Sequence, residues 1–310
     1  MFSVSDHAIP DPLRAGFRGI GQVFFQENAL TGICFAVGIA VSSPLMALGA
    51  VIGAAIGMAT ARLLKFDAAE VSAGLYGFNS TLVGIATFFF FQPGVMSVAL
   101  LLVGCIVAAL VTRLMRRYVP FPTYTAPFIV TTWVFFFLGL ALGVPRTEPG
   151  APFSSISFLG AVANGVSQVM FQASLWTALL FLIGIALSDW QHASWVVIGS
   201  VVGVLLATCI ANAGTQAVDP ESLVERTVFQ NMALGLYGYN ATLAAIALYL
   251  WRRSLIPALL GILLSVPLTE YVPLLGLPAL TAPFVLASWI VLGLGWLDGR
   301  LFPEKLSAPS

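Results

Sequence analysis

The stretch GLYGFNSTL at residues 74–82 decides the fold, because it returns as GLYGYNATL at residues 235–243. Seven of the nine positions are identical in the two copies. Such self-similarity within one chain indicates that the chain contains two copies of one structural unit. We therefore expect a first repeat over residues 1–150 and a second repeat over residues 151–310.

Two further pairs of segments occur in the same order. GIGQVFFQ at 19–26 returns 146 positions later as GVSQVMFQ, and TAPF at 125–128 returns 156 positions later. The GLYG motif is displaced by 161 positions. The displacement grows from 146 positions at the GIGQ motif to 161 at the GLYG motif. The second copy therefore carries a net insertion between these motifs, which we place in the polar stretch 212–226.

The composition is that of a protein that lies in a lipid bilayer. Of the 310 residues, 59% are hydrophobic and 8% are charged, and the mean hydropathy is +0.98. Soluble domains carry about 25% charged residues. Helices that cross a bilayer need about 20 apolar residues, and the apolar runs approach this length five times in each repeat. The expected fold is an all-α integral membrane protein with spans near 28–43, 44–64, 68–91, 95–112, 126–143, 172–188, 195–212, 227–250, 255–272 and 280–297.

The odd number of spans in each repeat sets the orientation of the two copies. Five crossings leave the first copy on the opposite side of the membrane, so the second copy is inverted, as in many transport proteins. Basic residues collect on the cytoplasmic side of membrane proteins, and only Arg146 and Arg226 depart from that rule if both termini are cytoplasmic. The basic residues that obey it are Arg14, Arg18, Arg62, Lys65, Arg113, Arg116, Arg117, Arg252, Arg253, Arg300 and Lys305.

Two proline-rich segments, 118–127 and 271–283, fit no full span. Proline has no amide donor and interrupts the helical hydrogen bonds. Exposed backbone at membrane depth is tolerated only where it is buried in protein or lines a wet cavity. We expect a re-entrant or broken half-helix in each segment, Pro127 and Pro283 included, and a pore where the two repeats meet.

Several classes of function are disfavoured by the sequence. A net charge of zero with dispersed basic residues leaves no basic face for nucleic acid. Cys34, Cys105 and Cys209 lie in apolar runs, and we interpret them as structural. The two histidines, His7 and His192, lie outside the expected spans, so we expect no enzyme, metal or cofactor. An ion-coupled carrier would place ionisable residues within its spans. In this chain four acidic residues lie near span ends instead: Asp67, Glu70, Glu225 and Glu270.

The twin Leu-Tyr-Gly-(Phe/Tyr)-Asn-x-Thr-Leu, Gln-Val-x-Phe and Thr-Ala-Pro-Phe motifs resemble those of the urea transporter family over nearly the whole chain. The resemblance implies passive, channel-like conduction of urea by a bacterial inner-membrane protein that forms a homotrimer. The rival function is a channel or carrier for ammonia or short amides. Resemblance to the ammonium channel family would require paired histidines within the membrane spans. The face formed by Gly49, Gly53 and Gly57 permits close helix contact within a protomer or between protomers.

The resemblance also implies roles for individual residues. Urea is planar and neutral, with four N–H donors and one carbonyl acceptor, so a passage for urea needs flat walls and hydrogen-bond partners. The resemblance implies one aromatic slot at Phe25, Phe78 and Leu82, a second at Phe171, Tyr239 and Leu243, amides at Gln22 and Gln168, and central hydroxyls at Thr125 and Thr281.

Each of these residues also has a structural interpretation. The aromatic rings can pack in the core or face lipid, and Gln22 and Gln168 can bridge helices. For Asn79 and Asn240 we favour a structural role, in which they cap or kink a helix. Tyr239 differs from Phe78 by a hydroxyl group, which makes the second slot more polar.

Overall fold

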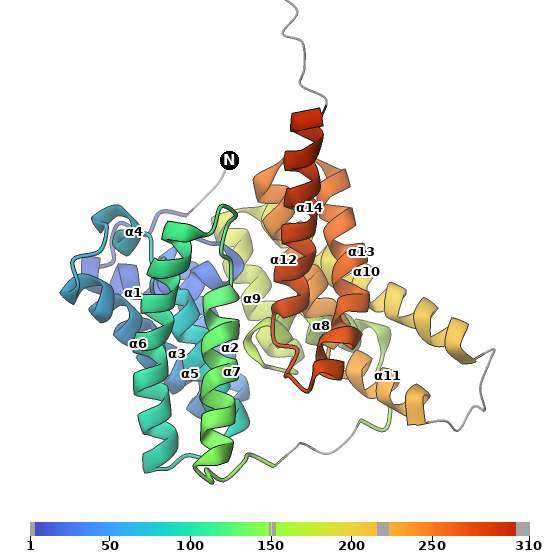
Figure 1. The fold of residues 1–310 in the computed structure, drawn as a ribbon, viewed down its shortest axis with the longest axis horizontal. Helices are drawn as coiled ribbons and strands as arrows, with labels where there is room; N and C mark the ends of the chain where they lie inside the picture. The colour runs from blue at the N-terminus through green and yellow to red at the C-terminus, as the bar shows by residue number, and fades with distance from the viewer. Residues whose placement is uncertain (1–3, 149, 151–152, 216–222, 302–310) are drawn as a thin grey trace, which may run out of the picture.

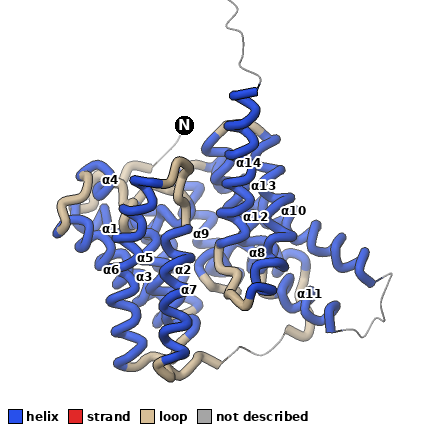
Figure 2. The backbone as a smooth tube through the Cα atoms, viewed as in Figure 1, coloured by secondary structure: helices blue, strands red, loops and turns tan. Residues whose placement is uncertain are grey.

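The computed structural model describes residues 4–148, 150, 153–215 and 223–301. Helices joined by loops make up this part of the chain (Figure 2). The first repeat, blue to green, lies beside the second repeat, yellow to red (Figure 1). The first contains α1 (Asp11–Gly21), η1 (Gln22–Phe24), α2 (Ala29–Ser42), α3 (Pro44–Leu63), α4 (Ala68–Ser72), α5 (Phe78–Phe90), α6 (Val95–Tyr118) and α7 (Ala126–Ala141). The second contains α8 (Phe158–Ser167), η2 (Gln168–Met170), α9 (Leu175–Ser188), α10 (Trp190–Thr215), α11 (Leu223–Ala233), α12 (Leu236–Trp251), α13 (Leu255–Tyr271), η3 (Val272–Leu275) and α14 (Ala282–Leu301).

The predicted all-helical membrane fold is confirmed, while two of the ten expected spans are each divided into two helices. By length and composition, five of the described helices can each cross a bilayer alone: α3, α6, α10, α13 and α14. The span expected at 68–91 is divided into α4 and α5, and the one at 227–250 into α11 and α12. Gly74 and Gly235 lie in these breaks, each at φ +81°, a backbone conformation that glycine adopts without strain.

The broken helices lie elsewhere than in the predicted proline-rich segments. No helix lies between α6 and α7, and only η3 lies between α13 and α14. The prolines of the two segments interrupt the chain there, as do the left-handed residues Tyr124 (φ 46°) and Leu280 (φ 45°). The bent pairs are instead α1–η1 with α2, at 73°, and α8–η2 with α9, at 69°. The bend from α1 to α2 was missed because Asp11, Arg14 and Arg18 make α1 amphipathic rather than apolar.

The insertion in the second repeat lengthens two helices. Where α3 has 20 residues, α10 has 26, and where α4 has 5, α11 has 11. Of the predicted insertion, residues 216–222 lie outside the described part of the chain.

The glycine face of α3 packs within the protomer. A β-carbon built on Gly49 would lie 2.4 Å from the carbonyl oxygen of Gly84, and one built on Gly53 would lie 2.2 Å from that of Ser80. Both carbonyls belong to α5, so any side chain at these positions would separate α3 from α5. This settles one alternative left open by the sequence, since these glycines bring together two helices of the first repeat.

Helices α2 and α9 show how the two repeats are related. The Thr31 hydroxyl donates to the Gly184 carbonyl (2.6 Å), and the Thr177 hydroxyl donates to the Gly38 carbonyl (2.8 Å). Each bond becomes the other under the 146-residue displacement, so a two-fold rotation relates them. From Thr31 to Gly38 the residue numbers rise along α2, while their partners on α9 run from Gly184 back to Thr177. The two helices are therefore antiparallel, as inverted repeats require.

An aromatic cluster fills the space between these two hydrogen bonds. The rings of Phe35 and Phe181, which are equivalent residues, have centroids 4.8 Å apart. Phe24 packs on both, at 5.2 and 5.9 Å. All three side chains are completely buried, and they form the apolar centre of the interface between the repeats.

Candidate permeation site between the two repeats

The two threonines of the TAPF motifs meet at the repeat interface. Their Oγ1 atoms are 2.6 Å apart, and both side chains are buried. The loops that carry them are held by a reciprocal pair of bonds: the Trp133 indole donates to the Pro278 carbonyl (2.8 Å), and the Trp289 indole donates to the Pro122 carbonyl (2.9 Å). Thr125 and Thr281 therefore lie where the two-fold relation brings one repeat onto the other.

The twin asparagines fix the start of the helices that follow these threonines. The Asn79 side-chain oxygen accepts from the Phe128 amide, and that of Asn240 accepts from the Phe284 amide, each at 3.1 Å. These amides lie in the first turn of α7 and α14, where backbone donors have no partner within the helix. The amide groups of both asparagines also donate, to Thr112 and Thr269. Each asparagine thus joins the GLYG motif of its repeat to the TAPF motif.

The prolines of the two motifs occupy the same first turns. Pro127 and Pro283 directly follow the first residue of α7 and α14, where proline is tolerated because its missing amide would have no helical partner. These prolines therefore start helices; they do not kink them.

Phe25 and Phe171 occupy equivalent, unusual backbone positions. They end the 3-10 turns η1 and η2 in the left-handed conformation, at φ 60° and 61°. This conformation turns each chain from one arm of a bent pair into the other. Both side chains are half-buried. A non-glycine residue is rare at such angles and is favoured there only by its surroundings.

The rings of these two phenylalanines reach across to the opposite repeat. The Phe25 ring lies 6.1 Å from that of Phe284, and the Phe171 ring lies 6.2 Å from that of Phe128. These two contacts are again equivalent by symmetry. Phe25 also contacts Tyr124 at 5.7 Å. The structure thus brings each of the two phenylalanines to the TAPF motif of the other repeat.

The remaining residues of the two predicted slots lie at the start of α5 and α12. Phe78 and Tyr239 are 7% and 6% exposed, and Leu82 and Leu243 are buried one turn further along. The Tyr239 hydroxyl donates to the Leu280 carbonyl. The described ring contacts of Phe25 do not include Phe78, so the two rings expected to form the first slot are not in direct contact.

One cavity brings together four of the five predicted pore residues of the second repeat, all except Leu243. It measures about 330 Å³, and Gln168, Phe171, Tyr239 and Thr281 all contribute to its lining. In the first repeat, Gln22 uses its side-chain amide to donate to the Ala73 carbonyl (2.9 Å). Gln22 thus bridges two helical segments, while Gln168 faces a cavity.

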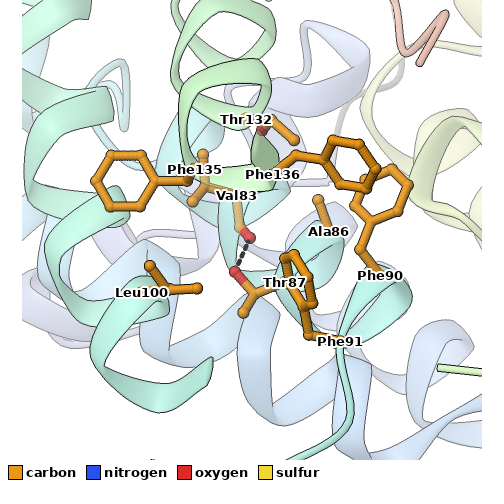
Figure 3. A pocket seen from close by; sticks show the side chains of 9 residues that line it. All are labelled: Val83, Ala86, Thr87, Phe90, Phe91, Leu100, Thr132, Phe135 and Phe136. Carbon is orange, nitrogen blue, oxygen red and sulfur yellow. Dashed lines mark hydrogen bonds between the residues drawn. The ribbon is translucent and has the colours of Figure 1, made fainter. Parts of the chain in front are cut away.

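Phe90 lines the large cavity and also a small one (Figure 3). The small cavity lies among α5, α6 and α7 and measures about 10 Å³, roughly the minimum that one water molecule needs. Thr132 contributes a buried hydroxyl that has no hydrogen-bond partner among the described residues. Urea is larger than water, so this second cavity is no part of a urea path.

Sequence reasoning missed five aromatic residues near the site, among them Phe128, whose ring contacts that of Phe171. Phe284 and Tyr124 contact Phe25, and Phe89 and Phe90 contact Phe171 at 4.8 and 6.3 Å. The available signal for Phe284 was its place in the TAPF motif. Phe89 and Phe90 belong to a run of four phenylalanines that has no counterpart in the second repeat, so the repeat gave no signal for them.

The bent helix pairs, the reciprocal contacts and the cavity at the repeat interface define an α-helical membrane transport protein built from two related halves. Its particular family follows from comparison with known proteins. The family model described as "Urea transporter" matches residues 13–295, and the chain belongs to the urea transporter family. It is 28% identical to urea transporter 1 of Ovis aries, of Capra hircus and of Mus musculus, over 94% of this chain and 79% of each relative.

The family settles the activity. The protein is a multi-pass membrane protein that conducts urea passively, and it is not an enzyme. The function predicted from the sequence is confirmed.

Proposed function

We propose that urea crosses this protein along the repeat interface, between the half-sites of Phe25 and Phe171, and passes the pair Thr125 and Thr281 at the centre. The observation that carries this proposal is the contact between the two threonine hydroxyls at 2.6 Å. Two groups that can donate and accept hydrogen bonds thus lie side by side on the proposed path.

Each end of the path would combine flat rings with polar groups. Phe25 and Phe78 with Leu82 would form the first slot, and Phe171 and Tyr239 with Leu243 the second, while Gln22 and Gln168 offer amide groups beside them. The cavity at Gln168, Phe171 and Tyr239 supports the second slot. A flat neutral solute can enter between rings, and its N–H groups need acceptors to replace water.

At the centre, urea would exchange hydrogen bonds with the protein. Without a solute at the centre, the Thr125–Thr281 hydrogen bond would close the proposed path. A urea molecule that arrives there would accept from one hydroxyl and donate to the other, so the lost protein bond is replaced. Because no charge is involved, this exchange needs no coupling ion.

Replacement of both threonines by valine tests the proposal, since valine keeps the shape and removes the hydroxyl. If each hydroxyl supplies a net hydrogen bond of about 0.5–1.5 kcal/mol at the rate-limiting point, urea flux falls by roughly 2- to 13-fold for each substitution. The measurement is stopped-flow light scattering on proteoliposomes under a urea gradient, with a glycerol gradient for comparison. Normal urea flux in Thr125→Val/Thr281→Val protein that assembles normally would remove the threonines from the mechanism.

We place both termini in the cytoplasm, and the protein in a bacterial inner membrane. The distribution of basic residues supports this orientation, and bacterial proteins with membrane-spanning helices, unlike outer-membrane barrels, belong to the inner membrane. An impermeant thiol reagent added from the periplasm should label Gln92→Cys but not Leu64→Cys, in a variant without the three native cysteines. The reverse pattern would overturn the orientation.

We also assign the two repeats to residues 1–150 and 151–310, and we propose a homotrimer embedded in the lipid bilayer. The displacement of the motifs supports the repeats, and the family resemblance supports the trimer. Light scattering coupled to gel filtration in detergent should give three chains per particle, and a mass of one or two chains would contradict the trimer.

A further inference from the structure

A basic cleft lies at the end of α6, away from the threonine pair. Its lining consists of Glu70, Tyr76, Arg113, Arg116 and Arg117, and its volume is about 320 Å³. Three arginines and one glutamate give the lining a charge of +2. All three arginines lie near the C-terminus of α6, where the helix dipole favours cations.

The acidic groups in this region are already engaged. Arg116 pairs with one oxygen of Glu70 (2.6 Å), while the other oxygen accepts from the Tyr76 hydroxyl. Asp67 accepts from the first amides of α4 and so caps that helix. The ion pairs among the described residues include Arg116 but neither Arg113 nor Arg117.

Aromatic rings position the other two arginines. The guanidinium carbon of Arg113 is 5.0 Å from the Phe66 ring centroid, and that of Arg117 is 5.5 Å from the Tyr118 ring centroid. Cation–π contact of this kind orients a guanidinium group, and each guanidinium carries five N–H donors. The two side chains are exposed, so these donors can bind an anion from outside the helix bundle.

An apolar stripe leads to the same two arginines. Val103, Ile106 and Leu110 are 52%, 41% and 41% exposed, and at helical spacing they lie on the face of α6 that carries Arg113 and Arg117. An acyl chain can lie along such a stripe, while a phosphate group reaches the arginines. A soluble anion would use the arginines alone and leave the stripe uncovered.

We infer that α6 binds an anionic phospholipid, with the phosphate between Arg113 and Arg117 and an acyl chain along Val103, Ile106 and Leu110. Basic pockets between membrane helices are suited to acidic lipid head groups. Glu70 competes with the lipid phosphate for Arg116 and limits the affinity. The site therefore accepts a phosphodiester with a net negative charge and disfavours a zwitterionic lipid.

The test is lipid retention by the detergent-purified protein, measured by native mass spectrometry after incubation with equal amounts of phosphatidylglycerol and phosphatidylcholine. At about fivefold for each arginine near an acidic lipid, Arg113→Gln/Arg117→Gln should lower phosphatidylglycerol retention about 25-fold and leave phosphatidylcholine unchanged. The control is Arg252→Gln/Arg253→Gln, which removes two exposed arginines at the end of α12 and should change retention less than twofold.

A second variant keeps the test decisive if the double variant does not fold. Glu70→Gln raises the charge of the lining from +2 to +3 and should increase phosphatidylglycerol retention about fivefold. Equal retention of the two lipids by the unsubstituted protein, or an equal loss in the control, would overturn the proposal. So would displacement of the lipid by glycerol 3-phosphate at the same concentration, because the ligand would then be a soluble phosphate.

Discussion

The two ends of the repeat interface share a backbone but differ in their side chains. Phe25 and Phe171 have the same left-handed conformation, and each reaches the phenylalanine of the opposite TAPF motif. Beside Phe25 stands the ring of Tyr124, whereas its equivalent beside Phe171 is Leu280, a residue without a ring. The second end has a cavity of about 330 Å³.

This difference separates two kinds of residue. Those that set the backbone, such as the twin glycines, asparagines and prolines, are identical in the two repeats. The residues that determine the size and polarity of each end of the path differ between the repeats, as Phe78 and Tyr239 show. The symmetric framework thus allows each end of the path to acquire its own lining.

The largest effect is expected where the repeats are most alike, at Asn79 and Asn240. Leucine is close to asparagine in size but accepts no hydrogen bond, so Asn79→Leu leaves the Phe128 amide buried without a partner. Such a loss costs about 1–3 kcal/mol, and the lost bond from the Asn79 side-chain amide to Thr112 adds about 0.5–1.5 kcal/mol. Asn79→Leu and Asn240→Leu should each lower the thermal unfolding temperature in detergent to a similar extent, and the double variant should lower it further.

A control for these variants is Asn231→Leu, which removes one long hydrogen bond of 3.5 Å to Glu270. It should change the unfolding temperature much less. If Asn79→Leu and Asn240→Leu lower the unfolding temperature to very different extents, the two helix starts match in geometry but differ in their contribution to stability.

An intermediate effect is expected where only the first repeat has an ion pair. The Arg18 guanidinium binds the Asp6 carboxylate and, despite its burial, lowers the pKa of Asp6 from its ordinary 3.8 to about 2. Asp6 also accepts from the Ala29 amide at the start of α2. In the second bend the Ser167 hydroxyl accepts from the Ser174 amide (3.2 Å), and the ion pairs of the described residues include no residue of α8 or η2.

Because the pKa of Asp6 is lowered on folding, its stabilisation is complete above about pH 4 and is lost as the pH falls toward 2. Asp6→Asn should lower stability by about 1.5–3 kcal/mol at pH 7, measured by thermal unfolding. The gap between the two proteins should narrow at pH 3. A gap that is equal at both pH values would show that the charge of Asp6 contributes nothing.

The smallest effect concerns the hydroxyl that distinguishes the two slots. Tyr239→Phe removes the bond to the Leu280 carbonyl and should cost about 0.5–1.5 kcal/mol of stability. The reciprocal change, Phe78→Tyr, points a hydroxyl toward the equivalent Tyr124 carbonyl and should cost nothing. Unchanged thermal unfolding of the Tyr239→Phe protein would mean that this bond does not stabilise the second slot.

Much of the fold could be predicted because the repeats constrain the sequence strongly. The GLYG and TAPF motifs mark backbone positions that tolerate few other residues, and the apolar runs locate most helices. The threonine pair could be predicted for the same reason, since both members belong to a repeated motif, and the structure brings them into contact.

The remainder depends on contacts between distant segments. The bend at Phe25 is set by the opposite repeat and by Asp6, which no local pattern reveals. The proline-rich segments looked like half-helices because proline marks a break in a helix without specifying the conformation that replaces it. The contacts of Phe89 and Phe90 with Phe171 depend on how α5 packs against the second repeat.

The reciprocal contacts of α2 and α9 have a consequence for the origin of the chain. Threonine, phenylalanine and glycine recur at matching positions of both helices, as Thr31, Phe35 and Gly38 and as Thr177, Phe181 and Gly184. A surface that pairs with an inverted copy of itself is isologous. Each repeat therefore carries the complete pairing surface of a symmetric dimer, and an ancestral single repeat could have assembled in pairs before duplication joined two copies in one chain.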